Sequence, residues 1–439
     1  MDREDIFQFI EDNDVKFIRF QFTDIAGIMK NIAITDSNLE SALDGVLFDG
    51  FAVDGFSRTE ESEMLLVPDL DTLNIFPWRP QQGKVVRLIC DVLTKDGEPF
   101  EGDPRYILKR VVNKAAEKGY AFNIGPECEF FLFHTDDNGL PTTHTHDTAG
   151  YFDLAPIDLG ENARREVSLA LENMGFLVEG SHHEVAGGQH EIDFRHDDPL
   201  KTADNIETFR MVVKIIAQKH GLHATFMPKP LQDEAGSGMH INLSTSQNGQ
   251  DIFTDARDEL GLSKEGYYFI GGIMQHIKGL TALLNPLVNS YKRLMPGNEA
   301  PAYIVWARKN RGPLIRVLSK RNGRTCLELL SPDATCNPYL SLAGLIGAGL
   351  YGIENKILPP PELKTNILSL SEKEITAQGI ERLPASLGEA LHELEKDTLL
   401  RDILGEHAFH SYLTTKYNEW KMYLHQVHPW EINQYLSVY

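Results

Sequence analysis

The chain has 439 residues and a formal net charge of −22, from 42 basic and 64 acidic side chains. Apolar residues make up 42% and charged residues 24%, which is ordinary for a globular protein with a large core. So large an excess of carboxylates repels nucleic acid and anionic lipid, and we expect neither nucleic acid nor a membrane as a partner.

The four cysteines form no C-x-x-C pair, which argues against a thiolate zinc site and favours a reducing, cytoplasmic location. The first residues are acidic and amphipathic, unlike a signal peptide. The longest nearly apolar run, residues 341–353, is too short to span a bilayer and predicts a buried helix.

The first part of the chain predicts a small α+β unit. Amphipathic spacing predicts a helix over 3–14, while alternation predicts strands over 15–24, 30–35, 70–78 and 83–92. Between them, residues 48–64 are polar and irregular, as functional segments often are. A turn at 101–105 starts a helix over 104–119, so we expect domains at 1–103 and 104–439.

The second part predicts a larger domain of the same α+β class. Its periodicity predicts helices over 161–174, 202–219 and 264–283, with strand-like segments between them. The last forty residues carry Trp420, Trp430 and several tyrosines, and this aromatic content predicts that they pack against the domain.

Residues 124–133 are apolar and aromatic except for two carboxylates, Glu127 and Glu129. In a strand, alternation places both on one face. Such a pair is a solvated face or, in apolar surroundings, a site where a cation neutralises the charges. Other carboxylate or imidazole side chains in or beside apolar, strand-like segments are Glu184, Glu191, His240 and Glu328.

Five carboxylates and one imidazole form a hard ligand set that suits two Mg²⁺ or Mn²⁺ ions and not zinc. Such ions bridge phosphate oxygens. Arginines crowd residues 308–324 and either supply cations for phosphoryl transfer or form a surface face paired with carboxylates. They are Arg308, Arg311, Arg316, Arg321 and Arg324. The P-loop motif is absent.

The chain resembles the glutamine synthetases of the short bacterial class over essentially its whole length. The resemblance rests on long segments that occur in the family's order. They include EGDPR (101–105), GPECEFFLF (125–133), SHHEVAGGQHEIDF (181–194), GSGMHINLS (236–244), NSYKRLMPGNEAP (289–301) and VHPWE (427–431).

The resemblance implies an N-terminal β-grasp domain, a catalytic α+β domain and a homo-oligomer of two stacked hexameric rings. It implies an ATP-dependent carboxylate–amine ligase, in which the side-chain carboxylate of glutamate is phosphorylated and ammonia attacks the acyl phosphate. A related γ-glutamyl amide is the neighbouring possibility. Active sites would lie between subunits.

The resemblance also implies roles for individual residues. Glu129, Glu184 and Glu191 would hold one metal ion, and Glu127, His240 and Glu328 a second. ATP would contact Glu179, Ser244 and Arg316. Glutamate and ammonium would contact Arg293, Gly236 and Tyr151. Asp49, Glu299 and Arg311 would be catalytic, with Asp49 serving a neighbouring subunit. Arg58 lies where this class places an arginine linked to feedback by glutamine.

Several positions depart from the family pattern around the substrate site. Phe51 and Ala52 replace two hydroxyl residues near the ammonium site, Ala235 replaces an asparagine, and Asn298 changes the flap. Cys326 and Leu330 replace the arginines on either side of Glu328. These changes indicate a different acid or amine, or weak glutamine synthesis. The alternative function is a paralogue with a regulatory or assembly role.

Overall fold

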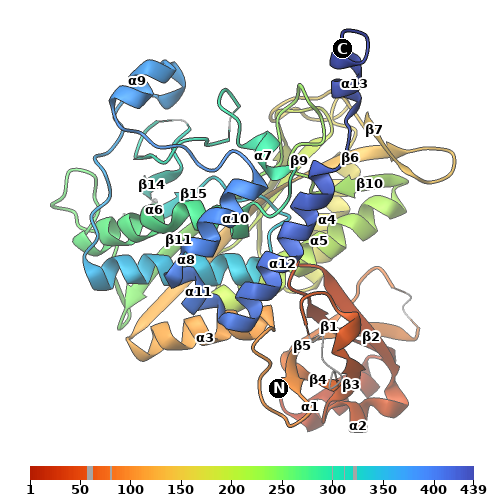
Figure 1. The fold of residues 1–439 in the computed structure, drawn as a ribbon. Helices are drawn as coiled ribbons and strands as arrows, with labels where there is room; N and C mark the ends of the chain where they lie inside the picture. The colour runs from red at the N-terminus through yellow and green to blue at the C-terminus, as the bar shows by residue number, and fades with distance from the viewer. Residues whose placement is uncertain (57–62, 80–81, 299, 311, 320–323) are drawn as a thin grey trace.

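A computed structural model describes residues 1–439 except 57–62, 80–81, 299, 311 and 320–323. Two separate sheets organise the described residues, and the chain passes from the first to the second near residue 100 (Figure 1). The α+β class and the small N-terminal sheet unit expected from the sequence are confirmed.

The small unit is a five-stranded sheet in the order β2-β1-β5-β4-β3, with β1 and β5 parallel. Its core forms because alternate residues such as Ile18, Phe20 and Leu88 point to one buried face. The elements are α1 (Arg3–Asp12), β1 (Val15–Thr23), β2 (Met29–Thr35), α2 (Leu39–Ala42), β3 (Val46–Asp49), β4 (Glu63–Ile75) and β5 (Lys84–Thr94).

The larger unit is built on a ten-stranded sheet whose main path runs β13-β14-β15-β11-β6-β9-β8. The strand β6 is central, and it pairs with β11 on one side and β9 on the other. The strands are β6 (Tyr120–Thr135), β7 (Pro141–Thr145), β8 (Val178–His183), β9 (Gln189–Phe194), β10 (Leu222–Thr225), β11 (Met239–Gln247), β12 (Gln250–Asp251), β13 (Trp306–Ala307), β14 (Ile315–Ser319) and β15 (Thr325–Leu329).

Helices pack around this sheet and supply most of the core (Figure 1). The predicted buried helix is confirmed as α8, which packs on α6 so closely that a Cβ on Gly272 would lie 2.2 Å from the Ala348 carbonyl. The helices are α3 (Pro104–Glu117), α4 (Glu161–Asn173), α5 (Pro199–Lys219), α6 (Lys264–Leu284), α7 (Ser290–Arg293), α8 (Pro338–Asn355), α9 (Glu372–Ala377), α10 (Leu387–Lys396), α11 (Thr398–Leu404), α12 (Glu406–Leu424) and α13 (Pro429–Tyr435).

One arginine joins the two units. Arg105, in the first turn of α3, is 3% exposed and forms ion pairs with Asp69 (2.8 Å), Asp91 (2.7 Å) and Asp204 (2.9 Å). Asp69 and Asp91 belong to β4 and β5 of the small unit, whereas Asp204 belongs to α5. A buried guanidinium with three carboxylate partners therefore sets the angle between the two units.

The C-terminal segment departs from expectation. Helix α12 packs into the core through Phe409, Tyr412 and Leu413, but α13 buries none of its residues, and Figure 1 shows it projecting from the body. The prediction that the whole segment packs against its own domain is wrong for residues 425–439. Its apolar side chains find no partner surface within the described part of one chain.

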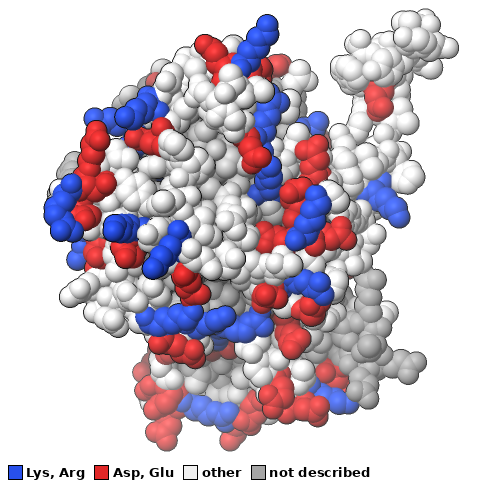
Figure 2. All heavy atoms as spheres, turned by 60° about the vertical axis from the view of Figure 1, so that its left-hand side comes forward, with Lys and Arg blue, Asp and Glu red and all other residues white. Residues whose placement is uncertain are grey.

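Surface charge and helix length relate to the expectation that nucleic acid and membranes are not partners. On the face in Figure 2, acidic and basic side chains are interspersed instead of forming one broad basic patch. Among the described residues, no helix combines the length and apolar character needed to cross a membrane.

Candidate active site

Three predicted metal ligands meet on neighbouring strands. Glu127 on β6 is directly opposite His240 on β11, and Glu328 lies on the adjacent β15. His240 Nδ1 lies 3.3 Å from Glu127 Oε2 and 3.5 Å from Glu328 Oε1. One ligand atom from each of the three lies within 4.8 Å of the others, so the set can hold one ion.

The other predicted ligands lie one strand away. Glu191 on β9 is opposite Glu129 on β6, and Glu184 is in the turn that follows β8. Ligand atoms of Glu184, Glu191 and His182 lie within 4.8 Å of one another. His182, the next-to-last residue of β8, was absent from the predicted set.

Glu129 lies next to this group but is not one of its three members. Its carboxylate accepts hydrogen bonds from the backbone N–H of Gly238 (2.8 Å) and the side-chain amide of Gln189 (3.1 Å). These contacts orient one carboxylate oxygen, while the negative charges of Glu184 and Glu191 remain close to it.

The electrostatics of the cluster call for cations. Burial, followed by the nearby charges of Glu129 and Asp193, raises the pKa of Glu191 to about 11. Burial also raises the pKa of Glu129. Burial lowers the pKa of His240, but its contacts with Glu127 and Glu328 outweigh this and raise it to about 10. Divalent ions would compensate buried carboxylate charge and take the place of the proton on His240, so the residues present fit two hard ions.

A cleft of about 390 Å³ opens beside the acidic cluster. Glu129, His240, Gly236 and Arg293 line it together, which brings predicted metal and substrate residues into one cavity. Arg293 is 4% exposed, and its guanidinium donates to the carbonyls of Ser331 (2.7 Å) and Leu330 (3.0 Å). A side chain at Gly238 would collide with that guanidinium at 2.3 Å.

The predicted nucleotide residues occupy different surroundings. Ser244 lies on β11 opposite Asn123 of β6. Glu179 on β8 is 51% exposed at its side chain and lies 3.6 Å from Arg195. Arg316 on β14 donates to Glu328, with Nη2 at 2.7 Å from Oε1, so its charge is directed at a candidate metal ligand.

The remaining predicted residues fall outside the cleft lining or outside the described chain. Tyr151 is 57% exposed, and its ring packs edge-on against His182 at 5.5 Å. Asp49 ends β3 in the small unit, where its carboxylate accepts from the Phe51 N–H at 2.9 Å. Glu299, Arg311 and Arg58 lie outside the described residues, as does Arg321 from the arginine run.

The residues that depart from the family pattern lie either in the wall of the cleft or away from it. Leu330 lines the acidic cleft, whereas Cys326 is fully buried with Sγ 3.4 Å from the Leu243 carbonyl. Phe51 is 63% exposed in the single chain. Ala235 and Asn298 line the same cleft, so the changes at Leu330, Ala235 and Asn298 alter its wall directly, whereas those at Cys326 and Phe51 do not.

A buried network behind the cluster was not predicted. His183 Nε2 lies 2.9 Å from Asp147, and His183 Nδ1 lies 2.7 Å from the Glu184 carbonyl. Asp147 also accepts from the Gly188 N–H at 2.8 Å. Together these contacts fix the turn that carries Glu184, and the only sequence signal was the repeated histidine in SHHE.

The fold and the site define a two-unit α+β protein whose larger sheet carries a paired, metal-ligating acidic cluster beside a substrate-sized cleft. Comparison with known families gives the same result. The glutamine synthetase catalytic domain matches residues 101–435, and the glutamine synthetase β-grasp domain matches residues 14–95. The chain belongs to the glutamine synthetase family.

Curated relatives match over their full length. The glutamine synthetase of Clostridium saccharobutylicum is 57% identical over 438 residues, covering 100% of this chain and 99% of that protein. That of Staphylococcus aureus is 51% identical over 439 residues, covering 100% and 98%.

Two solved structures are similar to this chain over nearly its whole length. A GmaS/ADP complex superposes with a TM-score of 0.89 at 33% identity, covering 98% of this chain and 99% of that one. The Plasmodium falciparum glutamine synthetase superposes with a TM-score of 0.87 at 26% identity, covering 99% of each chain.

Proposed function

We propose that this protein is an ATP-dependent ligase that joins ammonia to the side-chain carboxylate of glutamate, forming glutamine through γ-glutamyl phosphate. The observation that carries the proposal is the convergence of Glu127, His240 and Glu328 from three adjacent strands beside a cleft lined by Arg293. Curated relatives of the same length that carry the name glutamine synthetase support it. They also weigh against the purely regulatory alternative.

Two Mg²⁺ or Mn²⁺ ions are proposed as cofactors. Glu127, His240 and Glu328 would hold one, and Glu184 and Glu191, with Glu129 or His182, the other. Bound there, the ions would neutralise phosphate charge and polarise the transferring group. Arg316, already directed at Glu328, is suitably placed to balance phosphate charge near the first ion.

The chain's own residues would position both substrates. Arg293 is anchored by the Leu330 and Ser331 carbonyls and would bind the α-carboxylate of glutamate against Gly236. Ser244 and Glu179 are proposed to contact ATP, and Tyr151 to help bind ammonium. Glu299 and Arg311 keep their proposed catalytic roles from the family pattern.

The site is proposed to be completed by a neighbouring subunit. Asp49 lies in the small unit and does not line the cleft of its own chain, so its proposed ammonium role requires a second copy. The exposed apolar tail beyond residue 424 supports a homo-oligomer, for which we propose two stacked hexameric rings. We keep the domain boundary at 103/104 and a cytoplasmic location as parts of this proposal.

Turnover with a panel of amines tests the ligase. Phosphate release from ATP with glutamate should require Mg²⁺ or Mn²⁺ and an amine, with ammonium compared against methylamine and ethanolamine. Preference for an organic amine would move the product to a γ-glutamyl amide. Nucleotide binding without turnover on any amine would contradict the ligase and favour the regulatory alternative.

A metal-binding variant tests the cluster separately. Glu191→Gln removes a proposed metal ligand, and the metal-free protein should stay about as stable as the parent, because burial keeps the Glu191 carboxyl group protonated without metal and glutamine is a neutral group of the same shape. The increase in Tm on adding Mn²⁺ should shrink strongly. The matched control Glu166→Gln, at a partly exposed glutamate of α4 that is paired with Lys219 and lies outside the acidic cluster, should keep the full increase. An unchanged Mn²⁺ response in Glu191→Gln would remove this residue from the metal site.

A further inference from the structure

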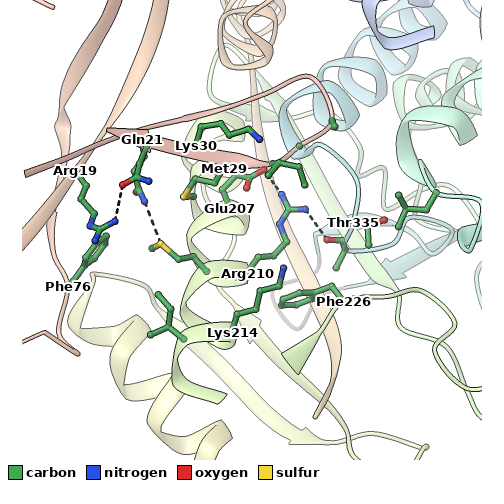
Figure 3. A pocket seen from close by; sticks show the side chains of 18 of the residues that line it. Arg19, Gln21, Met29, Lys30, Phe76, Glu207, Arg210, Lys214, Phe226 and Thr335 are labelled. Carbon is green, nitrogen blue, oxygen red and sulfur yellow. Dashed lines mark hydrogen bonds and ion pairs between the residues drawn. The ribbon is translucent and has the colours of Figure 1, made fainter. Parts of the chain in front are cut away.

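A second cavity, of about 600 Å³, lies between the small unit and the larger one (Figure 3). It shares none of its lining residues with the acidic cleft. Strands β1 and β2 form one wall, with Arg19, Gln21 and Lys30, and helix α5 forms the facing wall, with Arg210 and Lys214. Cavities of roughly 300–1,000 Å³ are the size class that encloses small molecules.

Cationic side chains outnumber carboxylates in this lining, which is unexpected in a chain of net charge −22. Part of the positive charge is neutralised within the protein. The paired cations are Arg210 with Glu207, Lys416 with Glu419 (2.9 Å) and Lys30 with Asp24 (3.2 Å).

Three lining cations keep an unbalanced charge. Arg19 donates to the neutral side chain of Asn31 at 2.9 Å, and no described carboxylate lies within ion-pair distance of Arg19, Arg79 or Lys214. Partial burial, together with the nearby Arg210, lowers the pKa of Lys214, and the opposing effect of Glu207 does not restore it. The cavity therefore has a positive potential that favours an anion.

Buried polar groups also lack partners at this wall. The side-chain carbonyl of Gln21 and the indole N–H of Trp78 are both buried and make no hydrogen bond in the described structure. Gln21 is 4% exposed and lines the cavity, as does Trp78. Since buried polar groups are normally satisfied, these two indicate a partner that the single chain does not supply.

Aromatic rings give the same cavity an apolar surface. Phe76 and Trp78 stack with centroids 4.7 Å apart and planes inclined by 18°. Across the cavity, Phe226 lies under the Lys214 ammonium at 5.8 Å from the ring centroid. A ligand with a flat apolar portion could contact these rings while its charge met the cations.

We propose that this cavity binds a small organic anion composed of an aromatic ring and a carboxylate or phosphate group. The anionic group would contact Lys214 and Arg19, and the ring would lie against Trp78, whose indole N–H and the neighbouring Gln21 carbonyl would gain polar partners. Because Arg19 belongs to β1 and Lys214 to α5, the bound anion would bridge the two units.

Trp78 provides a local readout in the assembled protein. Tryptophan fluorescence is titrated with benzoate, uridine 5′-monophosphate and inorganic phosphate, and the same titration of Trp78→Phe is subtracted. We expect a saturable change with benzoate or with the nucleotide, which assigns the ligand to aromatic carboxylates or to nucleotides. Nucleotide bound in the acidic cleft would leave the Trp78 signal unchanged.

Charge variants test the assignment. Lys214→Gln and Arg19→Gln should each weaken the binding by about tenfold or more, as expected for loss of a charge-assisted contact. The control Arg257→Gln removes an exposed arginine, paired with Asp255, outside the cavity and should bind like the parent. Both variants should retain their fold because the Lys214 side chain is exposed and Arg19 is only partly buried.

Three results would overturn the proposal. One is no Trp78 response to either aromatic anion at about 10 mM, which corresponds to binding weaker than about 3 kcal/mol. Another is binding of inorganic phosphate as tight as that of the aromatic anions. The third is a structure of the assembled protein in which a neighbouring subunit's side chain fills the cavity.

Discussion

At the scale of single residues, Leu330 has the most direct effect on the proposed chemistry. Its side chain forms part of the cleft wall, and its carbonyl accepts from Arg293 Nη2 at 3.0 Å. A leucine there leaves the cleft with less positive charge beside Glu129 and His240 than an arginine would. Slow phosphoryl transfer would follow from that loss.

Leu330→Arg should therefore raise the rate of glutamine formation. The new guanidinium would enter the open cleft and stabilise negative charge there, with an expected gain of about tenfold or more, since arginines at such sites contribute on the order of 10³ or more. Initial rates at saturating glutamate and ammonium measure the effect. Leu140→Arg, at an exposed leucine outside the cleft, is the matched control. Equal rates for parent and Leu330→Arg would show that the missing charge does not limit the reaction.

The same reasoning separates Cys326 from Leu330. Cys326 is 0% exposed, so an arginine there would place a charged guanidinium in a fully buried position. We therefore expect Cys326→Arg to destabilise the protein, although the family pattern alone placed the two positions on an equal footing.

Residue identity and local spacing were enough to predict most of the acidic cluster. Glu127 and Glu129 alternate on one strand. The other acidic ligands could be inferred because a carboxylate in an apolar segment is costly unless a cation compensates its charge. The grouping of His182 with Glu184 and the Asp147–His183 contact could not be inferred. Both depend on how β8, β9 and the segment near residue 147 come together in space.

At the scale of elements, the residue that caps the start of α3 makes the stability of the protein depend on pH. Asp103 caps the helix by accepting from the Arg105 N–H at 3.0 Å, and its other oxygen accepts from the Val92 N–H at 3.0 Å. Burial raises the pKa of Asp103 to about 7, although both backbone contacts oppose the shift. In the folded protein this carboxyl group therefore holds its proton to a higher pH than in the unfolded chain.

The sign of the effect on stability follows from proton binding. Between pH about 4 and about 7 the folded state binds more protons at Asp103, so its contribution to the free energy of unfolding decreases as pH rises. Asp103→Asn removes this term and should flatten the decline of Tm across that window relative to the parent. Thermal unfolding at several pH values measures the difference. Parallel curves for parent and variant would show that Asp103 does not titrate in this range.

Strand and helix bounds show what periodicity can and cannot predict. Helix α5 spans Pro199–Lys219, close to the predicted 202–219. In contrast, β4 begins at Glu63, well before the predicted 70–78, because pairing with β3 and β5 carries the strand through Pro68, a residue that argues against a strand interior. Long-range pairing of that kind leaves no local pattern.

At the scale of the whole molecule, the C-terminal tail separates the single chain from its assembly. Trp430 is 62%, Leu436 78% and Val438 68% exposed, and α13 buries none of its residues. Exposed apolar side chains clustered on a projecting helix are typical of an interface with another subunit. The aromatic content of the sequence predicted packing against the domain, which the described chain does not show for α13, and cover by a second copy belongs to the proposed assembly.

Removal of residues 425–439 should reduce the size of the assembly. Because α12 keeps its own core contacts through Phe409 and Leu413, the shortened chain should retain its helical content. Light scattering after size-exclusion chromatography measures the mass, and circular dichroism monitors the fold. Trp430→Ala should shift the mass in the same direction but less far, whereas Met1→Ala, at an exposed residue of the small unit, should leave it unchanged. An assembly of full size without the tail would exclude the tail from the main interface.

Arg105 has a mechanical consequence for any such assembly. To swing the small unit independently, a subunit would have to break both contacts that Arg105 makes to that unit, with Asp69 and Asp91. Force applied to the small unit by an adjoining copy would instead be passed on to α5, and from there to the rest of the subunit. In a ring of such subunits, an applied force would tilt each protomer as a rigid body and would not bend the linker near residue 100.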